Sequence, residues 1–224
     1  MADKLGPLGW MGLQFFGRMS ASISHEIKNV LAIINENAGL LEDFALMAEK
    51  GMPLDPERLE RVARGLMKQV QRADVIVRNM NRFAHSVDDF EKSVDLQELL
   101  AVVVRLAQRF ADMRRVNLDL RPAAAPVALA TRPFLLENLL WCCLDFAMDR
   151  AGSGGTVAIR MEKTDDGAQV VFEWMGAPGD AEARPFPSQE ERLLAEALAA
   201  RTELDVEGGR LRLILSKGNP GGAA

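Results

Sequence analysis

The stretch Met19–Leu41, MSASISHEIKNVLAIINENAGLL, has the apolar spacing of one long amphipathic helix. Its large apolar residues recur at steps of three, four and seven, which places them on one helical face: Met19, Ile23, Ile27, Val30, Ile34 and Leu41. His25 lies two residues from both Ile23 and Ile27, so at about 100° per residue its side chain points away from that face. We therefore expect a solvent-exposed histidine beside the carboxylate of Glu26, an arrangement that suits phosphorylation on a ring nitrogen.

The helix that carries His25 is expected to run from about Gly12 to Lys50. A second helix is expected to open at Asp55-Pro56 and to keep the same apolar spacing as far as Phe83. Two long helices joined by a short turn form an antiparallel hairpin. A lone hairpin buries little apolar surface, so we expect a homodimer in which two hairpins form a four-helix bundle. The alternative is a monomer in which the hairpin packs on the rest of the chain.

The second half of the chain has a mixed pattern. Ser86 to Ser93 is polar and charged, and we place a domain boundary there, between residues 1–90 and 91–224. Asp95 and Glu98 resemble a capping box before the next helix. Helices are predicted at 99–113, 134–150 and 189–200, and strands at 116–120, 156–161, 168–174, 204–207 and 210–215. Such a mixture predicts a two-layer α/β sandwich.

Composition excludes several classes of protein. A net charge of −5 argues against a general nucleic-acid-binding surface. No apolar run reaches the length of a membrane span, and the first residues lack a clean signal-peptide core. Cys142 and Cys143 are interpreted as small core residues with reduced thiols, which fits a cytoplasmic protein. Two distant histidines and this cysteine pair make no cluster of metal ligands, and His85 is assigned no chemistry.

The six residues Ser24-His25-Glu26-Ile27-Lys28-Asn29 resemble the phosphoacceptor box of the sensor histidine kinases, S-H-E-I/L-K/R-N/T-P. Val30 stands where that family usually has the proline. The order of elements from Val94 onward is similar to the family's ATP-binding domain. The resemblance implies a helical hairpin that carries the phosphorylated histidine, followed by a sandwich of the histidine kinase ATPase type.

Three positions depart from the family where it holds Mg-ATP. Laid on the family pattern N-L-L-x-N-A, residues 142–147 put Cys142 and Phe146 at the two asparagines. Trp174 stands about where the D-x-G-x-G motif has the aspartate that holds adenine. The segment 179–189 is short for an ATP lid and lacks the glycine pair that would open the next helix. We therefore expect this chain to bind no ATP and no other cofactor.

This combination is similar to the histidine phosphotransferases that are built from degenerate kinase cores. The resemblance implies a phosphorelay, in which the chain moves phosphoryl groups between response-regulator receiver domains. The expected donor is a receiver's aspartyl phosphate, which is activated and carries its own Mg²⁺.

Each residue of the box has an expected role in that reaction. His25 is the phosphoacceptor, and Glu26 is expected to hold its Nδ1–H, which leaves Nε2 as the nucleophile. Lys28 would offset the developing phosphoryl charge. Asn29 lies one turn after His25, and the resemblance implies that it positions a hydrolytic water.

Two other functions stay open at this point. The chain could be a non-catalytic or phosphatase-type module that docks a receiver and stimulates its dephosphorylation through Asn29. It could also be an active kinase with an unusual nucleotide site.

Overall fold

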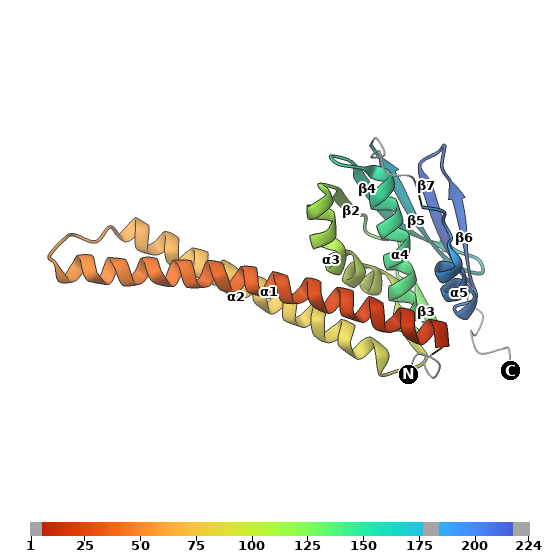
Figure 1. Cartoon of the computed structure of the whole chain (residues 1–224), viewed down its shortest axis with the longest axis horizontal. Coiled ribbons are helices and arrows are strands. Elements are labelled where there is room, and N and C mark those ends of the chain that lie inside the picture. Colours follow the sequence, from red (N-terminus) through yellow and green to blue (C-terminus); the bar gives the residue numbers. More distant parts are fainter. Residues whose placement is uncertain (1–5, 177–183, 217–224) are drawn as a thin grey trace. The chain divides into compact units, whose positions relative to one another are not determined.

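The computed structural model describes residues 6–176 and 184–216 (Figure 1). Two long helices come first, α1 (Gly6–Glu49) and α2 (Pro56–Ala84), followed by the short 3-10 helix η2 (His85–Val87). The remaining elements in chain order are β1 (Lys92–Asp95), α3 (Leu96–Arg114), β2 (Asn117–Leu120), β3 (Ala128–Thr131), α4 (Pro133–Ala151), β4 (Thr156–Thr164), β5 (Gly167–Met175), α5 (Gln189–Ala197), β6 (Ala200–Asp205) and β7 (Arg210–Ser216). The chain is thus a helical hairpin followed by a mixed α/β part, as predicted.

One compact unit, Met19–Asn81, is the greater part of the α1–α2 hairpin. Asp55 precedes α2 and accepts a hydrogen bond from the Glu57 amide at 3.0 Å, which supplies one of the donors at the helix start. Gly65 of α2 approaches α1 so closely that a Cβ added there would lie 3.2 Å from Oδ1 of Asn37. Gly65 therefore marks a point of close approach between the two helices.

The other unit contains α1 as far as Arg18 together with the described residues from Arg82 onward. Phe15 of α1, Phe83 of α2 and Phe134 of α4 form an aromatic cluster, with ring centroids 5.4 to 6.0 Å apart. Such ring contacts stabilise the fold beyond the contribution of burying their apolar surface. This cluster joins the start of α1 and the end of α2 to α4 within one unit.

A five-stranded sheet in the order β2-β4-β5-β7-β6 forms one layer of this unit. β2 is parallel to β4, and the other neighbours are antiparallel. The strands predicted at 116–120, 156–161, 168–174 and 210–215 are confirmed within a few residues. β6 begins earlier than predicted, because α5 ends at Ala197 rather than at residue 200.

A second, two-stranded sheet pairs β1 with β3 in antiparallel register. The sequence analysis missed β1, which is only four residues long and mostly exposed. Asp95 at its end is the N-cap of α3 and accepts hydrogen bonds from the amides of Gln97 and Glu98 at 2.8 and 3.1 Å. That cap starts the helix at Leu96, three residues before the predicted start.

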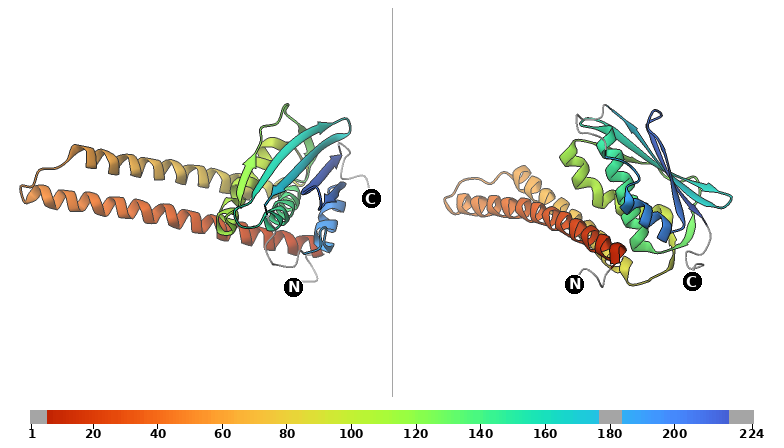
Figure 2. Two further views of the ribbon diagram at one scale, coloured as in Figure 1. Left: turned by 90° about the horizontal axis from the view of Figure 1, so that it is seen from above. Right: turned by 45° about the vertical axis from the view of Figure 1, so that its right-hand side comes forward.

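The two faces of the five-stranded sheet differ because side chains alternate along each strand. One face is apolar, and Figure 2 shows α3 (green), α4 (teal) and α5 (blue) on one side of the sheet. Its buried side chains include Val157, Ile159, Val170, Phe172, Leu211 and Leu213. The other face carries ion pairs of Glu173 with Arg160 and Arg210, at 3.2 and 3.0 Å. This one-sided pattern gives the predicted two-layer sandwich.

Candidate functional site

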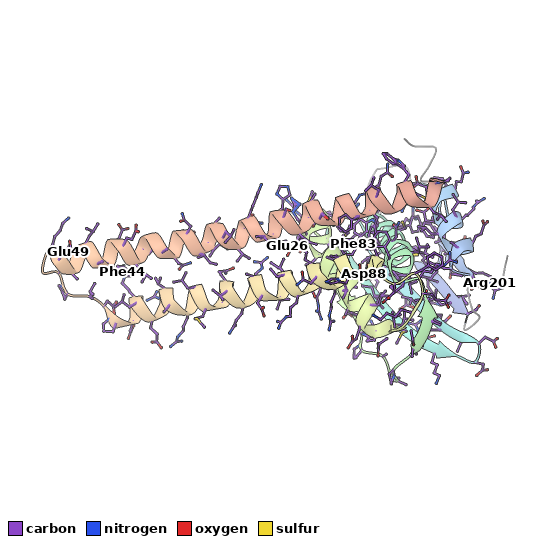
Figure 3. The ribbon with its side chains drawn as sticks, turned by 90° about the horizontal axis from the view of Figure 1, so that it is seen from below. Glu26, Phe44, Glu49, Phe83, Asp88 and Arg201 are labelled. Atoms are coloured by element: carbon purple, nitrogen blue, oxygen red, sulfur yellow. The ribbon has the colours of Figure 1, made fainter. Side chains whose placement is uncertain are left out.

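The phosphoacceptor box lies on α1 within the hairpin unit. His25, Lys28 and Asn29 are exposed, whereas Glu26 is half-buried; Figure 3 labels Glu26 on this helix. Ile23 and Val30 are buried, so the apolar face and the histidine face are separated as the spacing predicted.

The helix is regular around the box. α1 continues without a break through Val30, where the related family usually has proline. Backbone amides and carbonyls in a helix interior are already paired, so ligands there are met by side chains. The imidazole of His25 stands on a rigid backbone, and residues 25 and 29 are one turn apart on the same side. An exposed imidazole with one unprotonated nitrogen is chemically able to attack an activated phosphoryl group.

The second histidine has a different setting. His85 lies in η2, in the other unit, with Nδ1 2.7 Å from Oδ2 of Asp88, and both side chains are exposed. Figure 3 labels Asp88 beyond the end of α2. Among the described residues, no group of three or more His, Cys, Asp or Glu side chains is arranged to hold a metal ion.

The cysteines belong to α4. Cys143 is fully buried, and burial raises the pKa of its thiol well above its ordinary range. Cys142 is half-buried, and burial, assisted by the charge of Glu191, raises the pKa of its thiol to about 12. Both are free thiols that stay protonated near neutral pH, which makes them poor nucleophiles and poor metal ligands.

Aromatic rings occupy two of the positions at which the sequence analysis expected a nucleotide site to be lost, Phe146 and Trp174. Phe146 of α4 meets Trp174 of β5 edge to face, with ring centroids 5.9 Å apart. On its other side Phe146 packs on Phe186, at 4.7 Å between centroids. All three rings are buried. We call these residues the Phe146 cluster.

Arg184 covers the Phe146 cluster. Its guanidinium lies 5.7 Å from the ring centroids of Phe146 and Phe186, which is within the range of cation–π attraction. It also pairs with Glu191 at 2.6 Å and donates a hydrogen bond to the carbonyl oxygen of Cys142 at 3.3 Å. The buried Glu191 in turn closes a capping box with Ser188 at the start of α5. These contacts hold the segment before α5 against α4.

The carboxylate next to Trp174 in the sequence belongs to Glu173. It precedes Trp174, so its side chain lies on the opposite face of β5 from the helices. There it accepts hydrogen bonds from Arg160 and Arg210, and the bond from Arg160 lowers the pKa of its carboxyl most strongly. Residues 179–183 of the predicted short lid, 179–189, lie outside the described residues, and Gly179 is among them.

Four residues of the α/β unit that proved informative were absent from the sequence analysis. Arg184, Phe186 and Glu191 were missed because their contacts join segments about 40 residues apart in the chain or depend on the capping box. That box had a visible signal, Ser188 followed by Glu191 at the third position. Glu137 was missed too, although a lone acid inside the apolar run of α4 is unusual.

Neither a protein-family model nor a curated protein sequence matches the chain. Among solved structures it is similar to a bacterial phosphotransferase, with 16% sequence identity and a TM-score of 0.48, over 90% of this chain and 95% of that one. The Acinetobacter baumannii histidine kinase AdeS is 15% identical, with a TM-score of 0.46, over 87% of this chain and 98% of that one. The ATP-binding domain of PrrB from Mycobacterium tuberculosis is 19% identical, with a TM-score of 0.47, over 58% of this chain and 100% of that domain. All three TM-scores lie below 0.5, and these likenesses concern the arrangement of the backbone.

None of the helices in the described ranges 6–176 and 184–216 combines the length and the hydropathy that a membrane span requires.

Proposed function

We propose that this chain is a phosphorelay histidine phosphotransferase, which carries phosphoryl groups between the aspartates of receiver domains on His25. The observation that carries the proposal is the exposure of His25, Lys28 and Asn29 together on one stretch of α1. A phosphoacceptor must be reached by a bulky partner domain, and this stretch is open to solvent. The partners are response-regulator receiver domains, not nucleic acid, given the net charge of −5.

The proposed reaction is two successive phosphoryl transfers. Nε2 of neutral His25 attacks the phosphorus of a receiver's aspartyl phosphate, a new N–P bond forms, and the P–O bond to the aspartate breaks. The carboxylate leaves with the electron pair of that bond, and the receiver's own Mg²⁺ neutralises charge on the oxygens. Delivery to a second receiver runs the same step in reverse.

In the proposed reaction, neighbouring side chains assist His25. Glu26 holds Nδ1–H of the imidazole, which fixes the tautomer with Nε2 free and stabilises the cation that forms on attack. Lys28 offsets negative charge on the moving phosphoryl group. Asn29, one turn further, orients a water that removes phosphate from the receiver.

ATP plays no part in this proposal. Support comes from the Phe146 cluster, which is a group of packed, buried rings, and from Glu173, which is held on the far face of the sheet by two arginines. Neither group offers a ligand for Mg²⁺ or for an adenine amino group. The chain therefore needs no cofactor of its own.

We also propose that the chain acts as a homodimer in the cytoplasm. Met67, Val70 and Val77 lie at steps of three and seven along α2, and their exposed fractions are 60%, 53% and 45%. This spacing is a stripe on one helical face. A second hairpin placed against it would bury these side chains and complete the four-helix bundle that the sequence predicts.

A second candidate function rests on Asn29. Its exposed amide, one turn from His25, is suited to a receiver-binding module that stimulates dephosphorylation without a phosphohistidine. The variant His25→Ala distinguishes the two functions, because a phosphatase activity that depends on Asn29 would be retained without the imidazole.

The decisive experiment is phosphotransfer profiling. Each receiver domain of the source organism is phosphorylated on its aspartate and mixed with the purified chain, and label is followed over time. We expect label to move from at least one receiver to the chain and then to another receiver. His25→Ala should receive none. Absence of transfer from every receiver would contradict the proposal, and loss of receiver label that persists in His25→Ala would favour the phosphatase-type module.

A further inference from the structure

An apolar cavity of about 540 Å³ lies within the unit that joins the start of α1 to the described residues from Arg82 onward. Its walls come from the first turns of α1, from η2 and the segment after it, and from the start of α4. Among the described residues that line it, nine are apolar or glycine and one, Arg132, is charged. Its volume falls within the range of small-molecule sites, and neither of the functions proposed above uses it.

An aromatic cluster fixes one wall of this cavity. Phe134, which lines it, packs on Phe15 and on Phe83, with ring centroids 5.6 and 6.0 Å apart. Phe16, also in the lining, stacks on Phe83 at 5.4 Å between centroids, with the planes at 19°. Rings that are held by several neighbours cannot readily move into the empty space, so the apolar wall is preformed.

Two glycines of α1 help to leave this space open. Gly9 and Gly12 both line the cavity, although glycine inside a helix is destabilising relative to alanine. At Gly12 the structure supplies a reason, because an added Cβ would lie 3.0 Å from Cε1 of Phe134. The glycines therefore let α1 approach the aromatic wall and place no side chain in that part of the cavity.

The rim of the cavity combines exposed apolar side chains with a cation. Leu13, Val87 and Phe90 line it and have exposed fractions of 53%, 51% and 74%. The guanidinium of Arg132 lies 4.3 Å from the centroid of the exposed Phe90 ring. The positive charge therefore stands at the rim, beside side chains that a bound molecule would cover.

The charge at this rim favours an anion. Asp88 and Asp89, in the same segment as Phe90, pair with His85 and Lys92 at 2.7 and 3.1 Å, and none of the ion pairs within residues 6–176 and 184–216 includes Arg132. Arg132 is also the N-cap of α4, and its side chain makes no capping hydrogen bond there. Because the start of a helix attracts negative charge, the guanidinium and the helix end favour the same kind of ligand.

We propose that this cavity binds the anion of a medium-chain fatty acid, with the alkyl chain along the apolar walls and the carboxylate on the guanidinium of Arg132. A guanidinium can donate two parallel N–H bonds to a carboxylate, and such charge-assisted bonds are the stronger kind. The alkyl chain would remove apolar surface of the walls from water. Since those walls belong to α1, to residues 87–90 and to α4, the ligand would also hold the start of α1 against the start of α4.

The test is calorimetry of the full chain with decanoate below its micellar concentration. We expect saturable binding of one decanoate per chain and a higher melting temperature in its presence. Decylammonium has the same alkyl chain with the opposite charge, and butanoate has the same head group on a short chain, so each should bind at least tenfold more weakly. Arg132→Gln should weaken decanoate binding at least tenfold. Leu13→Glu, which adds a carboxylate to the wall, should do the same.

Two further variants serve as controls. Arg201→Gln removes an exposed arginine of β6, and Val206→Glu adds a carboxylate at an exposed valine, so both should leave decanoate binding unchanged. Leu13 is exposed, so Leu13→Glu keeps the proposal testable even if Arg132→Gln does not fold.

Three results of the titrations would overturn the proposal: equal binding of decanoate and decylammonium, unchanged affinity in either cavity variant, or no binding of decanoate at millimolar concentration. A halved mass of Leu13→Glu in light scattering would assign this face to a second copy of the chain and would overturn the proposal as well.

Discussion

Phe146 and Trp174 meet edge to face, with ring centroids 5.9 Å apart and planes at 87°. Phe146 comes from α4 and Trp174 from β5, and the sequence analysis expected both to stand where a nucleotide site has been lost. In this chain both positions contribute instead to a buried apolar contact. Both rings are part of the core of the α/β unit, and the proposal that ATP does not load His25 rests on this packing.

Truncation of the Phe146 side chain should destabilise the fold and should not create a nucleotide site. Phe146→Ala should lower the free energy of unfolding by about 3 kcal/mol or more, because the contacts with Trp174 and Phe186 are lost and a cavity remains. Urea unfolding followed by circular dichroism measures this. Met113→Ala removes a side chain that is exposed on α3 and should change stability by less than about 0.5 kcal/mol. Tight Mg-ATP binding by Phe146→Ala or by Phe146→Asn would count against the account of this region.

Glu137 should make the chain less stable as the pH rises. Burial raises its folded pKa to about 8, above the ordinary value of 4.5, so between these values the folded chain holds a proton that the unfolded chain has lost. The stability contribution is therefore complete below about pH 4.5 and is lost as the pH rises towards 8, at about 1.4 kcal/mol per pH unit. The comparison to make is wild type against Glu137→Gln in urea at pH 5 and pH 8.

The glutamine variant should gain stability relative to wild type at the higher pH, since it has no proton to lose. Glu173 and Glu191 affect stability at acidic pH instead. Arginine and backbone hydrogen bonds leave the pKa values of their carboxyls below the ordinary value, so their contribution to stability is lost as the pH falls. A difference between the two proteins that does not change from pH 5 to pH 8 would show that Glu137 ionises freely.

A charge on the exposed stripe of α2 should break the proposed dimer. Val70→Glu places a carboxylate where two hairpins would meet, and burying it unpaired costs several kcal/mol. We expect the mass measured by light scattering to fall from that of two chains to that of one. Val206→Glu makes a like change at an exposed valine of the α/β unit and should leave the mass unaltered. A single-chain mass for the wild type would exclude the four-helix bundle.

Asn29 should control the loss of phosphate from a receiver more than its transfer. Asn29→Ala removes the amide that would orient the attacking water, so dephosphorylation of the receiver should slow about tenfold while His25 still accepts label. Time courses of receiver phosphate with and without the chain give both rates. Asn35→Ala is the matched control, because Asn35 is an exposed asparagine further along the same helix. Equal slowing by both variants would show that Asn29 has no specific role in dephosphorylation of the receiver.

Local patterns in the sequence predicted most of the elements. The steps of three and four on α1 and α2 predicted both long helices and placed His25 on the exposed side of α1. Alternation predicted β4 and β5, and the cap at Asp95 predicted the helix that follows it. Periodicity reports which residues share a face of one element, and such a local pattern is visible in the sequence without knowledge of the fold.

Contacts between elements far apart in the chain could not be read from the sequence. The cluster of Phe15, Phe83 and Phe134 draws the ends of the hairpin helices into the α/β unit, and no local pattern encodes that meeting. β1 was missed because four mostly polar residues carry no alternation, and its partner β3 supplies the pairing. The replacements at Cys142, Phe146 and Trp174 were visible, but only packing shows that Phe186 and Arg184 close over them.

The central claim is that His25 is loaded by a receiver and not by ATP. The most direct measurement compares two incubations of the intact chain, one with Mg-ATP alone and one with a phosphorylated receiver, by the mass of the intact protein and by mapping of the modified residue. The account predicts one phosphoryl group on His25 from a receiver and none from Mg-ATP. A phosphoryl group on His25 from Mg-ATP alone, or none from any phosphorylated receiver, would contradict it.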